Sequence, residues 1–313
     1  MLSVEKITSQ NCNLIYDSLL RDIEHNSFHS KAIKKTFLLN IVIPLSIIIN
    51  DKFKKNTLCV SVSGGQGSGK TTITRYIKYY LKNYFNLNVV SFSIDDLYLS
   101  KDKRIRLSEE IHPLLLTRGV PGTHNINLAI EIISTLIKGG KEIMIPRFSK
   151  KNDDLLPKSE WTKYNGKPDI IILEGWCMGA SPQEEGFWQG PINSLEKTYD
   201  TDGFWAKWVN DQLSKSYEDL FKVFELSIYI KSINFEQILK NRWLQEKNAM
   251  EAEEEEREKA MYLTKEEVYN FVMHFERITK QMEEYMPAKS DIIITRKNKT
   301  EFLIEKPEIF IKI

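Results

Sequence analysis

Hydrophobic residues along the chain occur either in short dense clusters or at spacings of three and four. The dense clusters predict strands, at residues 58–63, 89–94, 142–145, 170–173, 226–230 and 291–295, and only 170–173 is apolar throughout. The spaced runs predict helices, at residues 71–83, 127–138, 204–221 and 235–259. Because strands and helices alternate along the chain, we expect an α/β fold with a mainly parallel sheet and helices on both faces.

Two apolar segments outside this alternation are also expected to be core. Residues 37–49 predict a buried helix on the main sheet, because they are shorter than the roughly 20 apolar residues that cross a bilayer. After Thr264 the apolar residues form one helical stripe, made of Val268, Phe271, Val272, Phe275, Ile278, Met282, Tyr285 and Met286. His274 and Arg277 lie off this stripe, so we expect them to be exposed to solvent.

The polar segments predict loops and one solvated helix face. Residues 98–126 and 146–169 are expected to be loops, and residues 181–195 an irregular excursion at the edge of the sheet. The acidic run 251–258 places Glu253 four residues before Arg257, a spacing that supports an exposed helix. We find no internal repeat or linker, so residues 1–313 are expected to form one domain, with residues 1–56 as a helical extension packed on the core.

Composition and charge narrow the class of protein. The chain has 313 residues, 42% hydrophobic and 28% charged, which is ordinary for a globular domain. A net charge of +1 provides no global field that would draw it to nucleic acid or to a membrane, so neither is an expected partner. Its three cysteines lack the short paired spacings of a zinc site or a disulfide framework. No export signal is predicted at the N-terminus, and the cytoplasm is the expected location.

The sharpest chemical signal is a phosphate-binding motif between the strand 58–63 and the helix 71–83. It matches the pattern G-x-x-x-x-G-K-[ST] at Gly64, Gly65, Gln66, Gly67, Ser68, Gly69, Lys70 and Thr71. Glycines let backbone N–H groups approach phosphate oxygens, Lys70 is expected to reach the β and γ phosphates, and the Thr71 hydroxyl to bind Mg²⁺. The dinucleotide-binding motif G-x-G-x-x-G does not fit, because after Gly65 and Gly67 its third glycine would fall on Lys70.

Carboxylates follow two of the predicted strands, at the sheet edge where ligands of α/β folds bind. Asp95 and Asp96 follow the strand 89–94, and Glu174 follows the strand 170–173. Asp95 is the expected general base for an attacking hydroxyl, with a helix cap or turn as the alternative role. Glu174 is expected to hold or orient Mg²⁺, with a structural hydrogen bond as its alternative role.

These motifs resemble those of the P-loop small-molecule kinases, the family that includes uridine kinase, phosphoribulokinase, pantothenate kinase and D-glycerate 3-kinase. D-glycerate 3-kinase is the most similar of these. The resemblance covers about residues 58–295 and rests on the segments 64–72, 93–99, 118–124, 146–150, 173–176 and 242–246. It implies a P-loop NTPase-type three-layer sandwich with a helical lid at residues 235–262, and ATP and Mg²⁺ as cofactors.

The resemblance also implies roles for individual residues. Thr72 extends the phosphate loop, and Arg242 resembles a lid residue that closes over the phosphates. The acceptor would be faced by Asp96, Tyr98, Arg118, His124, Arg147 and Lys150, with Asp95 activating its hydroxyl. One departure lies on this acceptor side: the Gly-rich turn and Asp-Arg pair that usually follow Pro-Arg-Phe are replaced by Ser149 to Pro157.

Several alternatives remain open on the sequence alone. His124 contacts substrate or only stabilises its turn, and Trp176 is expected to pack in the core rather than stack on a nucleobase. D-glycerate is the first candidate acceptor because the cationic residues Arg118, Arg147 and Lys150 suit a carboxylate. A nucleoside or pantothenate is the alternative small acceptor. A P-loop ATPase switch without an acceptor is the alternative from another class.

Overall fold

The computed structural model describes residues 35–251, 264–297 and 301–306. These residues form a six-stranded sheet in the order β10-β9-β8-β1-β7-β2, with parallel pairs throughout except for β10 beside β9. Its strands are β1 Leu58–Gly64, β2 Val89–Ser93, β7 Ile170–Gly175, β8 Leu226–Lys231, β9 Ile292–Arg296 and β10 Phe302–Lys306. The expected mainly parallel α/β sheet is confirmed, and β10 is an edge strand that the hydrophobic pattern did not predict.

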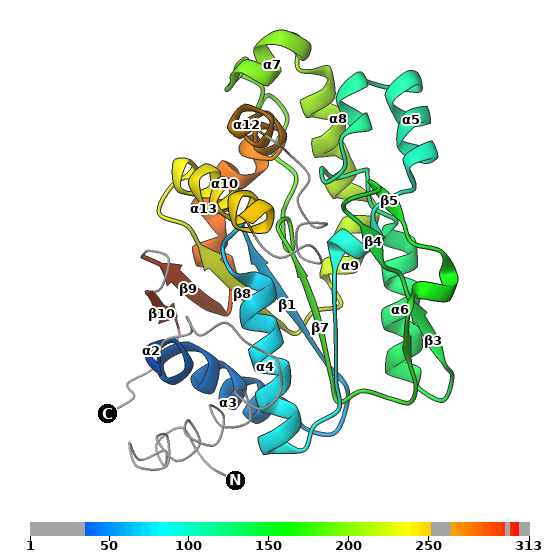
Figure 1. The fold of residues 1–313 in the computed structure, drawn as a ribbon, viewed down its shortest axis with the longest axis vertical. Coiled ribbons are helices and arrows are strands. Elements are labelled where there is room, and N and C mark those ends of the chain that lie inside the picture. The colour runs from blue at the N-terminus through cyan, green and yellow to red at the C-terminus, as the bar shows by residue number, and fades with distance from the viewer. Residues whose placement is uncertain (1–34, 252–263, 298–300, 307–313) are drawn as a thin grey trace.

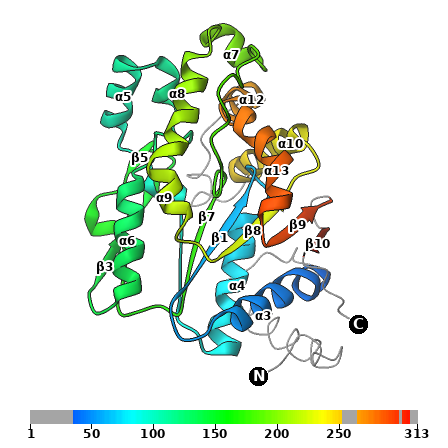
Figure 2. The same ribbon diagram turned by 180° about the vertical axis from the view of Figure 1, so that it is seen from behind.

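Helices cover both faces of this sheet (Figures 1 and 2). Successive residues of β1 and β7 point to opposite faces: Val60 and Ile172 pack toward one core, Cys59 and Ile171 toward the other. The first core includes α3 Ile43–Lys52 and α4 Lys70–Phe85. The second includes α6 Ile126–Lys138, α8 Phe204–Gln212 and α13 Glu276–Lys289. The predicted three-layer P-loop fold is therefore confirmed.

The expected buried helix at residues 37–49 is present, in three parts. α2 Lys35–Phe37 continues into a π-helical turn, Leu38–Val42, and then into α3. Buried residues of this segment, among them Leu38, Leu45 and Ile49, pack in the core beneath β1 and α4. No helix among the described residues is long and apolar enough to cross a membrane. The remainder of the predicted extension, residues 1–34, lies outside the described residues.

Two polar segments that we expected to be loops contain regular structure. α5 Lys101–Glu110 and the 3₁₀ turn Pro113–Leu116 follow the second strand. The strands β4 Phe148–Ser149 and β5 Asp154–Leu155 form a short hairpin. The helix α5 is nearly devoid of apolar positions, and its inward residue is the fully buried Arg104, so hydrophobic periodicity could not reveal it.

The predicted strand 142–145 does not join the main sheet. β3 Ile143–Ile145 pairs instead with β6 Thr162–Tyr164, which follows a 3₁₀ turn at Lys158–Glu160, in a separate two-stranded antiparallel sheet. The predicted helix 204–221 is also interrupted. Between α8 and α9 Glu218–Phe221 lies a π-helical turn, Leu213–Tyr217, in which Lys215 leaves the helical conformation.

The long apolar stripe is core, as expected, but it spans two helices, α12 Lys265–Met273 and α13. The prediction that His274 and Arg277 are exposed is wrong. His274 is 8% exposed, and Arg277 places Nη2 2.6 Å from Oε2 of the buried Glu196. The reason is tertiary: the short helix α7 Ser194–Tyr199 packs on α12 and brings Glu196 to the polar side of the stripe.

α10 Phe235–Glu251 follows β8 and lies above the phosphate loop (Figure 1). It covers the described part of the predicted lid, 235–262. The acidic run after Glu251 lies outside the described residues, so its expected exposure stays a prediction.

Candidate active site

The phosphate loop joins β1 to α4 and supports α10 from below. Gly67 and Gly69 have φ values of 68° and 99°, in the left-handed region that favours glycine. A Cβ atom on Gly65 would lie 2.6 Å from Cδ1 of Ile238, and one on Gly67 would lie 2.9 Å from Cβ of Asn241. Glycine is therefore required here by close packing against α10 as well as by access of phosphate to the backbone.

Lys70 and Thr71 stand at the start of α4, where the motif predicts them. Lys70 Nζ donates to the carbonyl oxygens of Gly64, at 2.8 Å, and of Gly65, at 3.0 Å. Burial lowers the pKa of Lys70, while the nearby Glu174 and Asp95 carboxylates oppose that shift. The ammonium thus lies folded over its own loop, within the cradle that a triphosphate would occupy.

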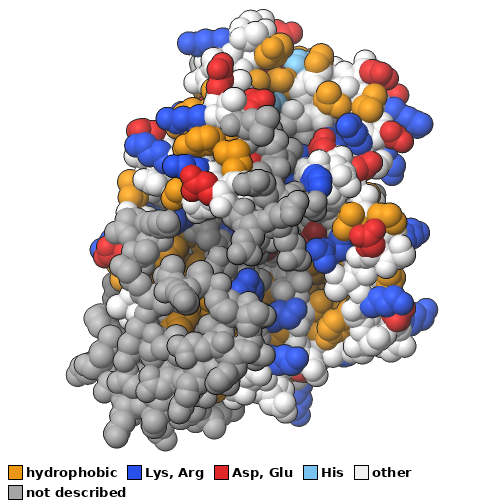
Figure 3. Space-filling view, in the orientation of Figure 1, with side chains coloured by type: hydrophobic (Ala, Val, Ile, Leu, Met, Phe, Trp, Pro, Cys, Tyr) orange, Lys and Arg blue, Asp and Glu red, His pale blue; other side chains and the backbone are white. Residues whose placement is uncertain are grey.

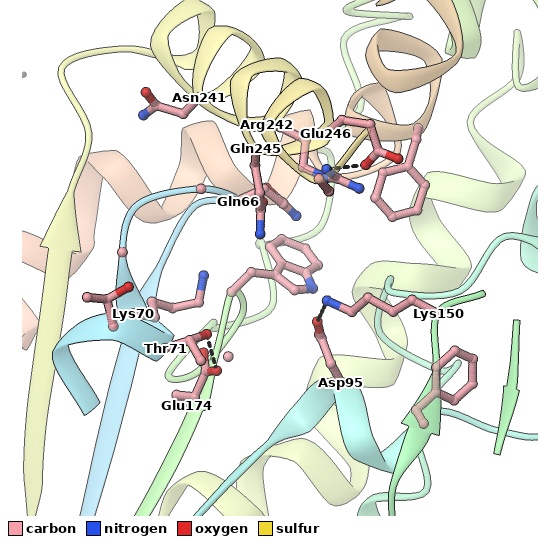
Figure 4. Close-up of a pocket in the computed structure, with 18 of the residues that line it drawn as sticks. Gln66, Lys70, Thr71, Asp95, Lys150, Glu174, Asn241, Arg242, Gln245 and Glu246 are labelled. Atoms are coloured by element: carbon pink, nitrogen blue, oxygen red, sulfur yellow. Dashed lines mark hydrogen bonds and ion pairs between the residues drawn. The ribbon is translucent and has the colours of Figure 1, made fainter. Parts of the chain in front are cut away.

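Thr71 and Glu174 form a pair of hard oxygen ligands. Thr71 Oγ1 donates to Glu174 Oε1 at 2.7 Å, which joins the start of α4 to the end of β7 (Figure 4). Burial raises the pKa of Glu174, and the Lys70 ammonium counteracts it. No cluster of three or more His, Cys, Asp or Glu suited to a metal occurs among the described residues. The pair fits Mg²⁺, which needs only one or two protein ligands when phosphates and water complete its shell.

The two aspartates after β2 face different environments. Ser93 Oγ accepts from the Asp95 N–H and so caps the 3₁₀ turn Ile94–Leu97, which directs Asp95 into the cavity. Asp96 does not line the cavity; its Oδ1 accepts from the Phe148 N–H at 3.3 Å. The structure therefore separates the pair into one cavity residue and one residue that attaches the β4–β5 hairpin.

Asp95 is held by two donors. Tyr98 OH donates to its Oδ1 at 2.6 Å, and Lys150 Nζ lies 3.2 Å from its Oδ2 (Figure 4). Burial by itself would raise the pKa of Asp95, but Lys150, Tyr98 and Lys70 together hold it well below its usual range. The carboxylate is therefore ionised at neutral pH and oriented by its two donors.

Arg118, Arg147 and Lys150 line the same cavity as Asp95, as the resemblance implied. Arg147 and Lys150 are exposed to it. Arg118 is 4% exposed, hydrogen-bonds to Asp153 through Nη1, and lies 5.3 Å from the Phe148 ring centroid. The charge of Arg118 is therefore engaged by an acidic partner in a buried position, whereas Lys150 pairs with Asp95 while remaining exposed.

His124 lies behind the cavity rather than in it. Its ring stacks at 4.9 Å on Tyr98, and Nδ1 is 2.7 Å from the Tyr217 hydroxyl. Burial lowers the pKa of His124 to about 4, so the imidazole is neutral at physiological pH. Of its two predicted roles, packing fits this position better than substrate contact. Trp176 lines the cavity but is 4% exposed, and it donates through Nε1 to the Gly119 carbonyl at 2.7 Å.

The cavity that contains these groups measures about 1240 Å³. Four segments far apart in the sequence enclose it: the phosphate loop, the end of β2, the β4–β5 hairpin and α10. Figure 3 shows Lys and Arg side chains along the middle of this face of the molecule. Arg242 lines the cavity from α10 and pairs with the buried Glu246, at 2.6 Å from Nη1 to Oε2.

Residues from both ends of the described chain also line the cavity, and we did not predict them. Phe37 from α2, Arg296 from β9 and Phe302 from β10 form this wall. Arg296 Nη1 donates to the Gly67 carbonyl oxygen, and its guanidinium lies 5.4 Å from the Phe302 ring. Nothing in their local sequence marks these residues, since tertiary packing brings them beside the phosphate loop: β9 pairs with β8 and carries Arg296, and β10 pairs with β9 and carries Phe302.

Comparison with known proteins gives the following likenesses. No protein-family model matches the chain. The uncharacterized kinase mug58 of Schizosaccharomyces pombe is 28% identical over 234 residues, which are 69% of this chain and 77% of that protein. The chloroplastic D-glycerate 3-kinase of Arabidopsis thaliana is 30% identical over 190 residues, which are 54% of this chain and 41% of that protein. The solved D-glycerate 3-kinase of Cryptococcus neoformans has a TM-score of 0.66 at 20% identity, covering 85% of this chain and 96% of that one.

These likenesses confirm the resemblance that the motifs predicted. The solved structure shares the fold, and the relatives in sequence are named as kinases. The chain spans less than half the length of the plant enzyme. Motifs, relatives and fold agree on one class, an ATP-dependent small-molecule kinase of the P-loop type, with D-glycerate 3-kinases among its relatives.

Proposed function

We propose that this protein transfers the γ-phosphoryl group of ATP to a hydroxyl of a small carboxylate-bearing acceptor, with D-glycerate as the first candidate. The observation that carries the proposal is the position of Asp95 in one cavity with Lys70 and with the exposed cations Arg147 and Lys150. A phosphate cradle, a proton acceptor and cations for a second anion are what such a transfer requires.

Each group has a role in the proposed reaction. Loop N–H groups and Lys70 bind the phosphates, and Thr71 and Glu174 would hold Mg²⁺, which would neutralise charge on the transferring phosphoryl group. The acceptor oxygen forms a bond to the γ-phosphorus while its proton passes to the Asp95 carboxylate. The bond from that phosphorus to the bridging oxygen breaks, and its electron pair leaves with ADP. Arg242 on α10 is the proposed lid residue that closes over the phosphates.

The acceptor class follows from the charge around Asp95. Arg147 and Lys150 face the cavity beside the base, so an acceptor with a carboxylate near its hydroxyl would meet both groups at once. A nucleoside would instead need an aromatic surface and amide groups on the acceptor side. Pantothenate also has a carboxylate and remains the second candidate. We further propose that the chain acts as one domain in the cytoplasm, as its composition predicts.

An acceptor screen tests this function. Purified protein with Mg-ATP is incubated with D-glycerate, pantothenate, uridine and several sugars, and ADP release is measured. We expect release to depend on D-glycerate, with pantothenate as the next best acceptor. Hydrolysis of ATP at one rate, whatever acceptor is present, would instead identify the protein as a P-loop ATPase switch.

A further inference from the structure

The ammonium of Lys150 pairs with the carboxylate of Asp95, the proposed base. Lys150 stands in the turn of the β4–β5 hairpin, and its Nζ lies 3.2 Å from Asp95 Oδ2, while the other oxygen of Asp95 accepts from Tyr98. Figure 4 shows the lysine side chain extended across the cavity to the carboxylate. An ammonium on Asp95 stabilises its charge and so lowers its affinity for the proton of an attacking hydroxyl. One of the two donors has to leave before Asp95 becomes an effective base.

The surroundings show which donor can leave. Tyr98 is 4% exposed, and its ring packs against His124 at 4.9 Å and Phe148 at 5.0 Å. The Lys150 side chain is 48% exposed and ends a flexible stem. A half-exposed ion pair of this kind is weak, so another carboxylate can compete for the lysine. Tyr98 is therefore the fixed donor and Lys150 the exchangeable one.

The hairpin that carries Lys150 is itself well anchored. Asp153, at the end of the same turn, pairs with the buried Arg104 at 3.1 Å and also with Arg118. Asp96 attaches the first strand by accepting from the Phe148 N–H. Because both ends of the turn are held, the side chain of Lys150 can change partner while the hairpin stays in place.

We propose that Lys150 is an acceptor-controlled latch on Asp95, an inference that rests on the proposed function. Until an acceptor binds, the ammonium pairs with Asp95. The carboxylate of a bound acceptor takes over the ammonium, and the freed Asp95 accepts the proton of the acceptor hydroxyl as its oxygen attacks the γ-phosphorus. Water has no carboxylate and cannot open the latch, so ATP is protected from hydrolysis while the acceptor is absent. The same residue thereby selects acidic acceptors and prevents waste of ATP.

The test compares Lys150→Met, which keeps the length of the side chain and removes its charge, with the wild type. We expect the rate of acceptor-free ATP hydrolysis to rise about tenfold, which is less than the 10²- to 10⁴-fold acceleration that a general base usually contributes. The kcat/KM ratio for D-glycerate over glycerol, which replaces the carboxylate by a hydroxymethyl group, is expected to fall about tenfold or more. A rise in hydrolysis that disappears in Lys150→Met with Asp95→Asn would assign the gain to the freed base.

Two variants serve as controls. Lys158→Met removes the same charge from an exposed position just after the hairpin, outside the residues that line the cavity, and both measurements should match the wild type. Lys150→Arg keeps the cation, so its acceptor-free hydrolysis should remain low, and unchanged thermal unfolding would show that each variant is folded. If Lys150→Met reduces D-glycerate phosphorylation but leaves acceptor-free hydrolysis unchanged, Lys150 only binds the acceptor and the latch is wrong. If the wild type phosphorylates no acceptor in the screen, the proposed function fails, and the latch with it.

Discussion

The two sides of the cavity are built in different ways. The nucleotide side comes largely from one contiguous stretch, the end of β1, the phosphate loop and the start of α4, with Glu174 added by the neighbouring strand β7. The acceptor side is assembled from the end of β2, the β4–β5 hairpin and Arg118, which are joined mainly by side-chain contacts around Asp95 and Asp153. One side depends on backbone geometry, and the other on a network of charges.

This difference explains why the reaction class is easier to recognise than the acceptor. A backbone cradle requires glycines at particular positions, so it leaves a readable motif. A charge network needs only compatible side chains on segments that the fold brings together, and many sequences satisfy it. We therefore expect substitutions on the nucleotide side to remove activity altogether and those on the acceptor side to alter selectivity, proton transfer or stability.

The largest expected effect is on the nucleotide side. Lys70→Ala should lower kcat by more than about 10³-fold, the range for losing one cation at a transferring phosphoryl group. Thermal unfolding without nucleotide should change little, because Lys70 bonds only to its own loop in the empty site. Steady-state ADP release measures the loss, with the exposed Lys82→Ala on the same helix as the control. Residual turnover of more than a few percent would place catalysis elsewhere.

Asp95→Asn is the corresponding test of the acceptor side. We expect kcat to fall by about 10² to 10⁴-fold, the usual contribution of a general base, with ATP affinity nearly unchanged. Asp96→Asn is the matched control, and it should cost less than about tenfold, because an amide oxygen can still accept from Phe148. Equal losses in the two variants would mean that the carboxylates act as one unit, contrary to their separation in the structure.

Glu174→Gln separates metal binding from phosphate binding within the nucleotide side. The Mg²⁺ concentration for half-maximal activity should rise about tenfold, the lower end of the range for a lost partner of a metal ligand. Nucleotide affinity should change less, since the loop still holds the phosphates. Magnesium titration at saturating ATP measures the shift, and an unchanged titration would leave Glu174 with only its structural bond to Thr71.

Asp153→Asn tests whether the acceptor side depends on its charge network. Asp153 has a φ of 51°, which asparagine tolerates, so the substitution removes charge with little backbone strain. Arg104 and Arg118 lose a shared carboxylate, so we expect the free energy of unfolding to fall by roughly 1–3 kcal/mol. This is less than for a fully buried ion pair, because Asp153 is partly exposed to solvent. The KM of the acceptor should rise several-fold while the KM of ATP stays constant. Equal rises in both would argue against two separable sides.

The smallest expected effect is on the pH dependence of stability, through His124, which packs behind Asp95. Burial depresses the pKa of His124 to about 4 in the folded protein, below the value of about 6.5 in an unfolded chain. The unfolded state therefore binds more protons between these values, so stability is highest above pH 6.5 and falls as the pH drops toward 4. The slope is up to about 1.4 kcal/mol per pH unit. His124→Gln should remove this part of the slope in denaturant titrations, leaving the part due to His274, whose pKa burial also lowers to about 4. An unaltered slope would mean that His124 is not buried as a neutral group.

Much of the fold and the nucleotide side could be predicted from the sequence alone. Dense clusters of apolar residues located the strands β1, β2, β7, β8 and β9, because strands covered by helices on both faces are mostly apolar. The glycines, Lys70 and Thr71 predicted the phosphate-binding loop, because few other residues fit its backbone conformation or bind phosphate and Mg²⁺. These features are local, and local features leave a pattern in neighbouring residues.

Only the tertiary structure decided the rest. It buried Arg104 and His274 and left the Arg277 side chain only 13% exposed, although helical periodicity treats all three as solvent-facing. Arg104 and Arg277 meet carboxylates from distant segments, whereas His274 bonds to carbonyl oxygens of the preceding helical turn and packs against the distant Trp205. It separated Asp95 from Asp96, which the sequence presents as equals, and it brought Lys150 from a polar turn onto Asp95. It also placed Arg296 and Phe302 beside the phosphate loop, through the pairing of β9 with β8 and of the edge strand β10 with β9. Polar contacts over long sequence separations depend on where whole elements pack, and that information is spread over the entire chain.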